Sequence, residues 1–500
     1  MNGHRHKLGR RQLLQLGAAG VAAAGAASLI GRDRTARGES SPKVVAPEDR
    51  KLLFVFCAYG GASIIDSFLP IAESEVGDPE LAATLNVFPD DLVAQPSGSN
   101  IRYVKLLDDY SFYSTPPEMA SLVTRHGSDM VVIPHNVSSV NHTIGQQRSL
   151  NGAGIHRGRT IMEAMALRYG GGLPLPSCNM AIDGYARHGA DPSIPQEARH
   201  EMIAAPRLFA SGTHGYRGLA GVPAEAGILA ARKVRSELDE RSLFARTFQN
   251  SPKLARYLRA REETALSLEQ AEMIDKLLLL DSSELDEKYG VKPSELVTSL
   301  RERFPNLGED DTQAQVVLGF LMAYYGMSTS VTLGHKPDPV LLADGSIVGT
   351  PIAFDFSHNL HRIVQSIMWG RTANLLDQLI DLLKTHDYLG DPALGKMWDR
   401  SLIYVATEFG RDKIRSSGAS QWGTSHHMNN GALLISPLLK GNAVYGGVDP
   451  TTALTYGFDP QTGEPDKNRT LYESDVYSLI AHALDIEFPE RIDFPALVRG

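Results

Sequence analysis

Short, uniformly apolar runs recur along this chain and alternate with longer stretches of helical periodicity. Apolar runs of about four to eight residues that end at Gly or at polar residues are typical of strands buried on both faces. They predict strands at 51–58, 130–133, 178–182, 328–333, 402–406 and 432–435. Apolar residues spaced three and four apart predict helices at 116–125, 159–168, 313–326, 361–383 and 471–486. Because strand, helix and strand follow one another repeatedly, we expect an α/β fold with a mostly parallel sheet and helices on both faces.

The pattern changes between about residue 222 and residue 310. Apolar residues in this stretch, including a run at 274–280, recur at helical spacing among many charged residues. We therefore expect an inserted helical region at 222–310, which serves either as a cap or as an additional packing layer.

The first residues have the composition of an export signal. The basic stretch Met1–Arg11 contains no acid and precedes an apolar stretch rich in Ala and Gly. Such an order is typical of a secretory signal, and the pair Arg10-Arg11 followed by Leu13 favours the twin-arginine pathway. An uncleaved membrane anchor is the alternative, although the run is short and Gly-rich for a stable span. We expect a signal peptide at 1–30, a polar linker at 31–50 and a domain at 51–500, located in the periplasm or outside the cell.

Composition limits the classes of protein that fit this chain. With 500 residues, of which 42% are hydrophobic, the chain is long enough for a sizeable core. A net charge of −9 gives no reason to expect a nucleic-acid partner. The two cysteines, Cys57 and Cys178, form at most one disulfide, and whether they pair stays open. No segment after the signal is apolar enough to predict a stable membrane span, and the oligomeric state stays open.

The densest chemistry follows the strand at 402–406. This strand ends in Glu408, Phe409, Gly410 and Arg411, and a Ser/Gly-rich stretch then leads to the pair His426-His427 and to the next strand. We call this segment the 408–427 loop. Open α/β sheets hold their sites just beyond the carboxyl ends of strands, so the 408–427 loop is the first candidate for a functional site.

Polar residues also follow three other predicted strands or apolar runs. Gly60 and Gly61 lead to Ser63 and Asp66, the second strand leads into 138–143, and a later run carries Asp355 and His358 (or, alternatively, His335 and Asp338). The carboxyl ends of parallel strands meet at one edge, where carboxylates and imidazoles can bind Zn²⁺, Mn²⁺ or Ca²⁺. Two such ions can clamp the attacking and leaving oxygens of a phosphate or sulfate ester, with a Ser or Thr as nucleophile. The candidate metal ligands are Asp66, Asp355, His358, Glu408, His426 and His427, and the candidate catalytic residues are Ser63, His142, Thr143 and Arg411.

Each of these candidates also has a structural interpretation. Glu408 can form an ion pair with Arg411 or cap a helix, and Thr143 can act as a helix N-cap. A His pair on a loop can be merely solvated. Arg411 can bind an anion with two parallel hydrogen bonds, or it can be structural.

Several motifs together resemble a known family. They are the twin-arginine leader, Gly60-Gly61-Ala62, the strand Ser330–Gly334, Glu408-Phe409-Gly410-Arg411 with a His 15–20 residues later, and the terminal Ala481–Ile486. These motifs resemble domain of unknown function 1501 over essentially the whole mature chain, with divergence in the central helical part. That family is similar to the alkaline phosphatase/sulfatase superfamily. The resemblance implies an alkaline-phosphatase-like three-layer core and a metal-dependent hydrolase of small-molecule or polymer esters of phosphate or sulfate.

The segment Ser138–Ala166 looks like the sulfatase segment around the nucleophile, with Asn151-Gly152 and Thr160 as loose matches. Other positions depart from the superfamily pattern. Phe409 stands where its enzymes usually have a ligating His, and the nucleophile motif is missing from 138–146. The alternative hypothesis is therefore a degenerate, non-catalytic member of the fold that binds an envelope polymer, a glycan or a protein.

Overall fold

The central strand of the sheet is apolar at every position because it is covered on both sides. In the computed structural model, β1 (Leu52–Ala58) is buried throughout, and its side chains alternate between two hydrophobic clusters. Phe54 and Phe56 belong to one cluster, whereas Val55 and Cys57 belong to the other. The continuous apolar run thus predicted a doubly covered strand correctly.

The structure describes residues 42–213, 223–259, 272–281, 286–287, 290–337, 339–349, 352–415, 419 and 421–499. The predicted signal peptide at 1–30 and the first part of the predicted linker, 31–41, lie outside the described residues. The rest of the linker, 42–50, is attached to the domain: Lys43 N–H donates to the Leu167 carbonyl at 2.9 Å, and Gly171 N–H donates to the Lys43 carbonyl at 2.9 Å.

Eight strands form the main sheet in the order β14-β4-β13-β10-β1-β7-β5-β6. Only β13 runs antiparallel to its neighbours in this sheet; the other pairings join parallel strands. The mostly parallel sheet is therefore confirmed. Besides β1, its strands are β4 (Met130–Asn136), β5 (Ser177–Asn179), β6 (Glu201–Met202), β7 (Ser330–Gly334), β10 (Ser401–Thr407), β13 (Asn429–Ile435) and β14 (Ala443–Val444).

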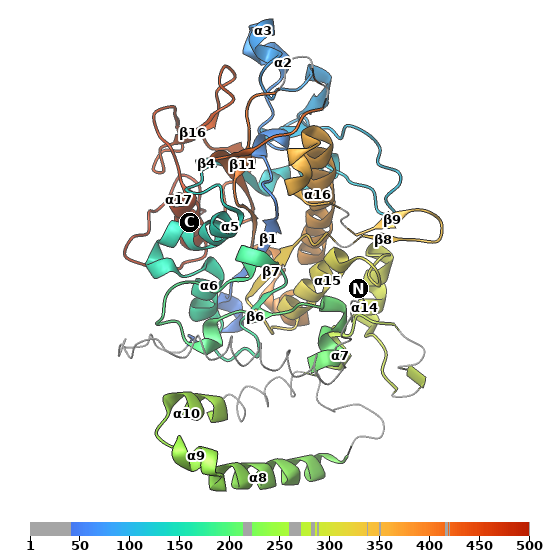
Figure 1. Cartoon of the computed structure of the whole chain (residues 1–500), viewed down its shortest axis with the longest axis vertical. Helices are drawn as coiled ribbons and strands as arrows, with labels where there is room; N and C mark the ends of the chain where they lie inside the picture. Colours follow the sequence, from blue (N-terminus) through green and yellow to red (C-terminus); the bar gives the residue numbers. More distant parts are fainter. Residues whose placement is uncertain are drawn as a thin grey trace, which may run out of the picture. The chain divides into compact units, whose positions relative to one another are not determined.

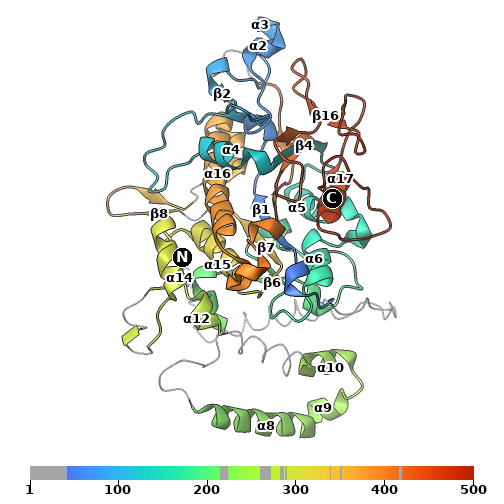
Figure 2. The same cartoon turned by 180° about the vertical axis from the view of Figure 1, so that it is seen from behind.

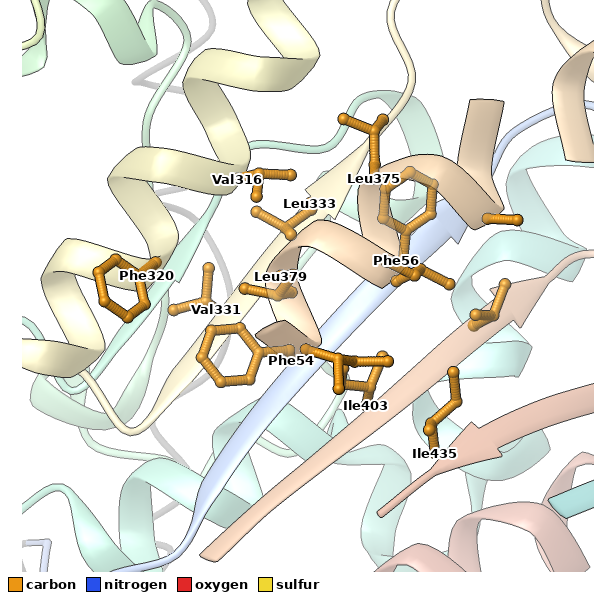
Figure 3. Packing of buried hydrophobic residues seen from close by; sticks show 14 of the residues in the cluster. Phe54, Phe56, Val316, Phe320, Val331, Leu333, Leu375, Leu379, Ile403 and Ile435 are labelled. Atoms are coloured by element: carbon orange, nitrogen blue, oxygen red, sulfur yellow. The ribbon is translucent and has the colours of Figure 1, made fainter. Parts of the chain in front are cut away.

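Helices cover both faces of the sheet, which makes the core three-layered (Figures 1 and 2). One layer contains α4 (Ala120–His126), α15 (Asp311–Tyr324) and α16 (His361–Thr385). The opposite layer contains α5 (His142–Asn151), α6 (Ile161–Tyr169) and α17 (Glu473–Ala483). Figure 3 shows the first interface, where Phe320 of α15 and Leu379 of α16 pack on Phe54 and its neighbours.

The helices predicted at 159–168, 313–326, 361–383 and 471–486 are present, with small shifts at their ends. The strand predicted at 178–182 is shorter than expected and ends at Asn179. The Asn179 side chain explains this end, because it accepts a hydrogen bond from Ala181 N–H at 2.9 Å and donates to the Tyr185 carbonyl at 2.8 Å. Such local side-chain bonds compete with the ladder of a sheet.

In the predicted insertion at 222–310 the main described elements are α8 (Glu225–Arg241), α9 (Leu243–Thr247), α10 (Pro252–Arg259), α12 (Met273–Leu277) and α14 (Glu295–Arg303). Leu277 of α12 and Leu300 of α14 are buried in the main core. The second half of the region is thus a packing layer, whereas α8, α9 and α10 carry many exposed apolar side chains.

Smaller elements complete the described chain. They are α2 (Glu73–Val76), α3 (Pro79–Ala82), α7 (Phe209–Thr213), β2 (Val93–Ala94), β3 (Tyr103–Val104), β8 (Val340–Leu341), β9 (Ile347–Val348), β11 (Gly410–Arg411), β12 (His426–His427), β15 (Gly447–Val448), β16 (Thr455–Phe458) and β17 (Pro465–Asp466). Cys57 and Cys178 are buried free thiols on β1 and β5. Of the helices that the structure describes, none has the length and apolarity needed to cross a bilayer.

Candidate metal centre

Four segments that are distant in sequence meet beyond the carboxyl ends of β1, β4 and β10. β1 continues into Gly60-Gly61, β4 leads to His142 at the start of α5, and β10 leads to Glu408. The fourth segment is a short 3₁₀ helix, Phe354–His358. The 408–427 loop is closed at its base, because β11 pairs antiparallel with β12 and places Arg411 opposite His426.

A carboxylate oxygen and three imidazole nitrogens converge in this space. Asp355 Oδ1 lies 3.3 Å from His142 Nε2, 3.4 Å from His358 Nε2 and 3.7 Å from His426 Nε2. The Nε2 atoms of His358 and His426 are 2.9 Å apart. His142, Asp355 and His426 each offer a ligand atom within 4.8 Å of the other two. The predicted ligands Asp355, His358 and His426 are therefore neighbours, and they are joined by His142, which sequence reasoning placed among the catalytic residues.

These separations match the edges of a coordination polyhedron. Two ligands about 2.1 Å from a cation are about 3.4 Å apart at a tetrahedral angle and about 3.0 Å apart at a right angle. The observed separations of 2.9 to 3.7 Å bracket these values. His142, Asp355 and His426, whose ligand atoms lie within 4.8 Å of one another, can thus surround one cation, and His358 lies beside them.

In two of the imidazoles, the Nδ1 atom, which does not face Asp355, lies within hydrogen-bond distance of an acceptor. His426 Nδ1 lies 2.8 Å from the Val140 carbonyl, which can only accept, so the proton is on Nδ1 and Nε2 carries a lone pair when the ring is neutral. Burial lowers the pKa of His426, and Arg411 lowers it further, although the Val140 carbonyl opposes both effects; the neutral ring is therefore favoured. His142 Nδ1 lies 3.0 Å from Glu408 Oε1. An acceptor on Nδ1 is the usual way in which proteins direct Nε2 toward a metal ion.

Glu408 is a buried carboxylate with one oxygen engaged. Its Oε1 accepts hydrogen bonds from Gly60 N–H at 2.6 Å and from His142 Nδ1. Its Oε2 is buried and makes no close hydrogen bond, although the Gln146 amide is near enough to favour the charged form. Burial raises the pKa of Glu408, and the hydrogen bond and charge of His142 oppose that effect.

In the absence of a cation, a charged His142 can satisfy both carboxylates. Hydrogen bonds to Asp355 and Glu408 raise the pKa of His142 to about 9. Hydrogen bonds from His142 and Arg411 hold the pKa of Asp355 well below its usual range. The donor set is therefore stable without a cation as a bridged ion pair, in which one imidazolium proton occupies the direction that a metal ion would take.

Arg411 is fully buried and holds the site together from behind. Its guanidinium donates to the carbonyls of Gly60, Gly61, Phe354 and Thr424, and to Asp355 Oδ1 at 3.1 Å. The side chains of Arg411 and Glu408 are 0% exposed, whereas those of Asp355 and His142 are 36% and 32% exposed. Solvent therefore reaches Asp355 and His142 but not Arg411, so Arg411 is a positioning residue in this structure.

Phe409 and the Gly60-Gly61 pair shape the site in ways that sequence reasoning missed. The Phe409 ring stacks on His426 with 3.9 Å between centroids and meets His142 edge-on at 5.0 Å. Phe409 cannot ligate a metal, but it fixes the orientation of two rings that can. Gly60 has φ +99°, and a Cβ there would lie 2.1 Å from the Asp355 nitrogen, so only glycine allows this close approach.

The remaining predicted residues lie elsewhere. His427 alternates with His426 along β12, and its Nδ1 accepts from Asn429 N–H at 3.1 Å instead of joining the cluster. Thr143 is in the first turn of α5, where Asn141 and not Thr143 provides the N-cap. Ser63 donates its backbone N–H to Gln365 at 3.0 Å, and no described contact links it to Asp355.

Asp66 belongs to a second, buried cluster. It accepts hydrogen bonds from Asn86 Nδ2 at 3.1 and 3.2 Å and lies 3.0 Å from His361 Nε2. His361 Nδ1 in turn lies 3.0 Å from Thr424 Oγ1. Asp66 thus supports the start of α16 and the 408–427 loop, and its described contacts do not reach the three-imidazole cluster.

The lowered pKa of Asp66 leads us to expect that its contribution to the unfolding free energy depends on pH. Burial raises the pKa of Asp66, but the charge and hydrogen bond of His361 outweigh it and hold the pKa at about 2, below the usual 3.8. A carboxyl with a lowered pKa stabilises the fold above its unfolded pKa, and this contribution is lost as the pH falls through the folded pKa. The gap in unfolding free energy between wild type and Asp66→Asn is expected to shrink by about 2 kcal/mol between about pH 5 and about pH 2. Urea denaturation of both proteins over this range measures it, and a pH-independent gap would contradict the assignment.

Comparison with known proteins adds no relative. No protein-family model matches the chain, and no curated protein matches it. The resemblance to domain of unknown function 1501 therefore rests on the sequence motifs alone.

Proposed function

We propose that this chain is an exported, metal-dependent hydrolase of phosphate or sulfate esters, located in the periplasm or outside the cell. The observation that supports it most is the convergence of three imidazole Nε2 atoms on Asp355 Oδ1, with His142 and His426 each bound through Nδ1 to an acceptor. Neutral rings with lone pairs directed at a carboxylate repel it unless a proton or a cation lies between them. A proton on His142 takes this place when no cation is bound, and a cation can replace that proton.

The donor set favours zinc among the ions that the sequence suggested. Imidazole nitrogens suit Zn²⁺ and other transition metals, with Mn²⁺ preferring more oxygen ligands. Ca²⁺ is usually held by six to eight oxygens, and here a single carboxylate oxygen stands among three nitrogens. We therefore expect Zn²⁺ first, Mn²⁺ second and Ca²⁺ last.

The residues around the site have distinct parts in such a reaction. His142, Asp355 and His426, with His358 beside them, would hold the cation, which would supply a Lewis acid for an ester oxygen. Glu408 keeps the His142 ring in the orientation that presents Nε2, Arg411 fixes Asp355, and Phe409 covers one face of His426. No Ser or Thr hydroxyl has a described contact with the four donors, so water is the proposed nucleophile: its oxygen bonds to phosphorus or sulfur, the ester bond breaks, and the alcohol leaves with a proton.

A binding protein without catalysis is the second candidate. It is favoured by the engagement of Arg411, whose N–H groups are directed at protein acceptors, so this guanidinium is not left to hold an anion. In this case the donor set binds a glycan, an envelope polymer or a protein, with or without a cation, and no ester turns over.

The neighbouring histidines of β12 give a matched test of the proposal. Purified wild type is expected to contain about one equivalent of Zn²⁺ or Mn²⁺ by plasma mass spectrometry. It is also expected to hydrolyse 4-nitrophenyl phosphate or 4-nitrophenyl sulfate and to lose this activity in a chelator. His426→Ala is expected to lose both the metal and the activity, because it removes a ligand. His427→Ala, one residue further along the same strand, is expected to retain both.

The results separate the two candidates. Bound metal without turnover of either ester in wild type supports the binding protein. If purified wild type contains no metal and shows no activity that a chelator removes, both the proposed hydrolase and the proposed metal centre are wrong. Equal losses in His426→Ala and His427→Ala would show that the effect comes from the fold of the 408–427 loop and not from ligation.

A further inference from the structure

The segment 223–259, which comprises α8, α9 and α10 (light green in Figure 1), exposes an unusual amount of apolar surface. Of the 21 large apolar side chains that are exposed among the described residues, seven lie in these 37 residues. They are Leu229, Val234, Leu238, Leu243, Phe244, Phe248 and Tyr257, with exposures between 48% and 74%. Scattered exposed apolar residues are ordinary, but a concentration of this kind marks an interaction surface.

In helix α8 the pattern of buried and exposed positions is the reverse of that in an ordinary surface helix. Its half-buried positions, Ile228, Arg232, Ser236 and Asp239, are three or four residues apart and lie along one side. Three of these four residues are polar. Val234 and Leu238 are also four apart, lie on a different side, and are 54% and 64% exposed. Burial among the described residues does not explain this pattern, because the apolar positions Val234 and Leu238 are the exposed ones.

The charge of the same segment is opposite to that of the whole chain. The segment contains eight Lys or Arg and four Asp or Glu, whereas the chain has a net charge of −9. From Arg241 to Arg259 there are five basic residues and no acidic one, interleaved with Leu243, Phe244 and Phe248. A partner must therefore accept apolar side chains and offer negative charge over the same stretch.

We infer that the segment 223–259 binds the surface of an anionic lipid bilayer. Basic amphipathic helices with Phe and Leu lie in the plane of the interface, with apolar side chains among the acyl chains and basic ones at the headgroups. A bilayer meets both requirements over the whole segment, whereas a protein groove would have to be long, apolar and acidic. α8 has 17 residues, and their charges prevent it from crossing the bilayer, so the segment lies on the membrane.

The inference is independent of the metal centre and is tested with the full-length protein and two kinds of vesicle. Wild type is expected to co-sediment with vesicles of 70% phosphatidylcholine and 30% phosphatidylglycerol at least about tenfold more strongly than with pure phosphatidylcholine, and less strongly as salt is raised. The triple variant Leu243→Ser, Phe244→Ser and Phe248→Ser is expected to lose about tenfold in affinity. A matched triple variant at exposed apolar positions elsewhere, Leu341→Ser, Leu454→Ser and Ile492→Ser, is expected to bind as wild type does.

A local probe distinguishes this segment from the apolar N-terminal stretch, which all variants share. A polarity-sensitive fluorophore on Phe248→Cys is expected to shift to the blue on anionic vesicles, while the same fluorophore on Leu341→Cys is expected not to shift. The buried free thiols Cys57 and Cys178 do not compete for the label. Equal binding to both vesicles, or an unshifted probe at 248, overturns the inference. So does a wild-type dimer that the first triple variant dissolves without any vesicle binding, since the partner would then be a second copy.

Discussion

Asp355→Ala is expected to abolish stoichiometric metal binding and to reduce ester hydrolysis to background. Asp355 Oδ1 lies 3.3, 3.4 and 3.7 Å from the Nε2 atoms of the three imidazoles, and it is the proposed anionic ligand of the donor set. Loss of an outer partner of a ligand commonly costs 10–100-fold in metal affinity, so loss of this ligand is expected to cost more than about 100-fold. Isothermal titration with Zn²⁺ against a competing chelator measures the affinity, and 4-nitrophenyl ester turnover measures the activity.

Two further variants separate ligation from folding. Asp355→Asn keeps an oxygen that can accept from Arg411 Nη2, now 3.1 Å from Asp355 Oδ1, but removes the negative charge. It is expected to fold like wild type and still to lose most of its metal affinity. Asp344→Ala changes an exposed carboxylate that bonds only locally to Ser346, and it is expected to keep both metal and activity. Wild-type affinity in Asp355→Asn would show that Asp355 serves the fold and not a cation.

The sheet was predictable because its central strands are apolar at every position. β1 and β10 are buried throughout and stand out as unbroken runs. The direction of β13 was not predictable, because an apolar run has the same composition whichever way it is paired. β13 pairs antiparallel with both β10 and β4. The 408–427 loop therefore connects the end of β10 to the start of a neighbouring strand that runs back beside it.

The candidate site was predictable only as a list of strand-end residues. His142, Asp355 and Glu408 were candidates because they follow predicted strands or apolar runs, and these three residues do meet. Asp66 was a candidate for the same reason. Asp66 pairs instead with His361, and nothing in the sequence around Asp66 indicates this long-range partner. His426 and His427 look equivalent in a loop; they differ because β11 and β12 pair, which gives the two side chains opposite directions.

Arg411→Ala is expected to destabilise the fold by about 3–5 kcal/mol, which is a large part of the stability of an ordinary domain. Arg411 is 0% exposed, and its removal takes away the guanidinium donor of the Gly60, Phe354 and Thr424 carbonyls. The Gly61 carbonyl also loses this donor but keeps a hydrogen bond from Gln365 Nε2 at 3.1 Å. It also removes the buried guanidinium from Asp355, which then keeps only the imidazoles as partners among its described contacts. A buried acceptor that loses its only donor keeps the full cost of its desolvation. Urea denaturation at neutral pH measures the change in unfolding free energy.

Two other arginine substitutions test whether the effect comes from burial and geometry. Arg411→Lys keeps the charge, but a single ammonium cannot reach carbonyls on three sides, so it is expected to recover less than half of the lost stability. Arg102→Ala removes a surface arginine that pairs with Glu75 at 2.8 and 3.0 Å, and its expected cost is under about 1 kcal/mol. If Arg411→Ala cost no more than Arg102→Ala, the guanidinium would not be what holds Gly60-Gly61, the 3₁₀ helix and the 408–427 loop together. Asp355 would then need another support to stay among the three imidazoles.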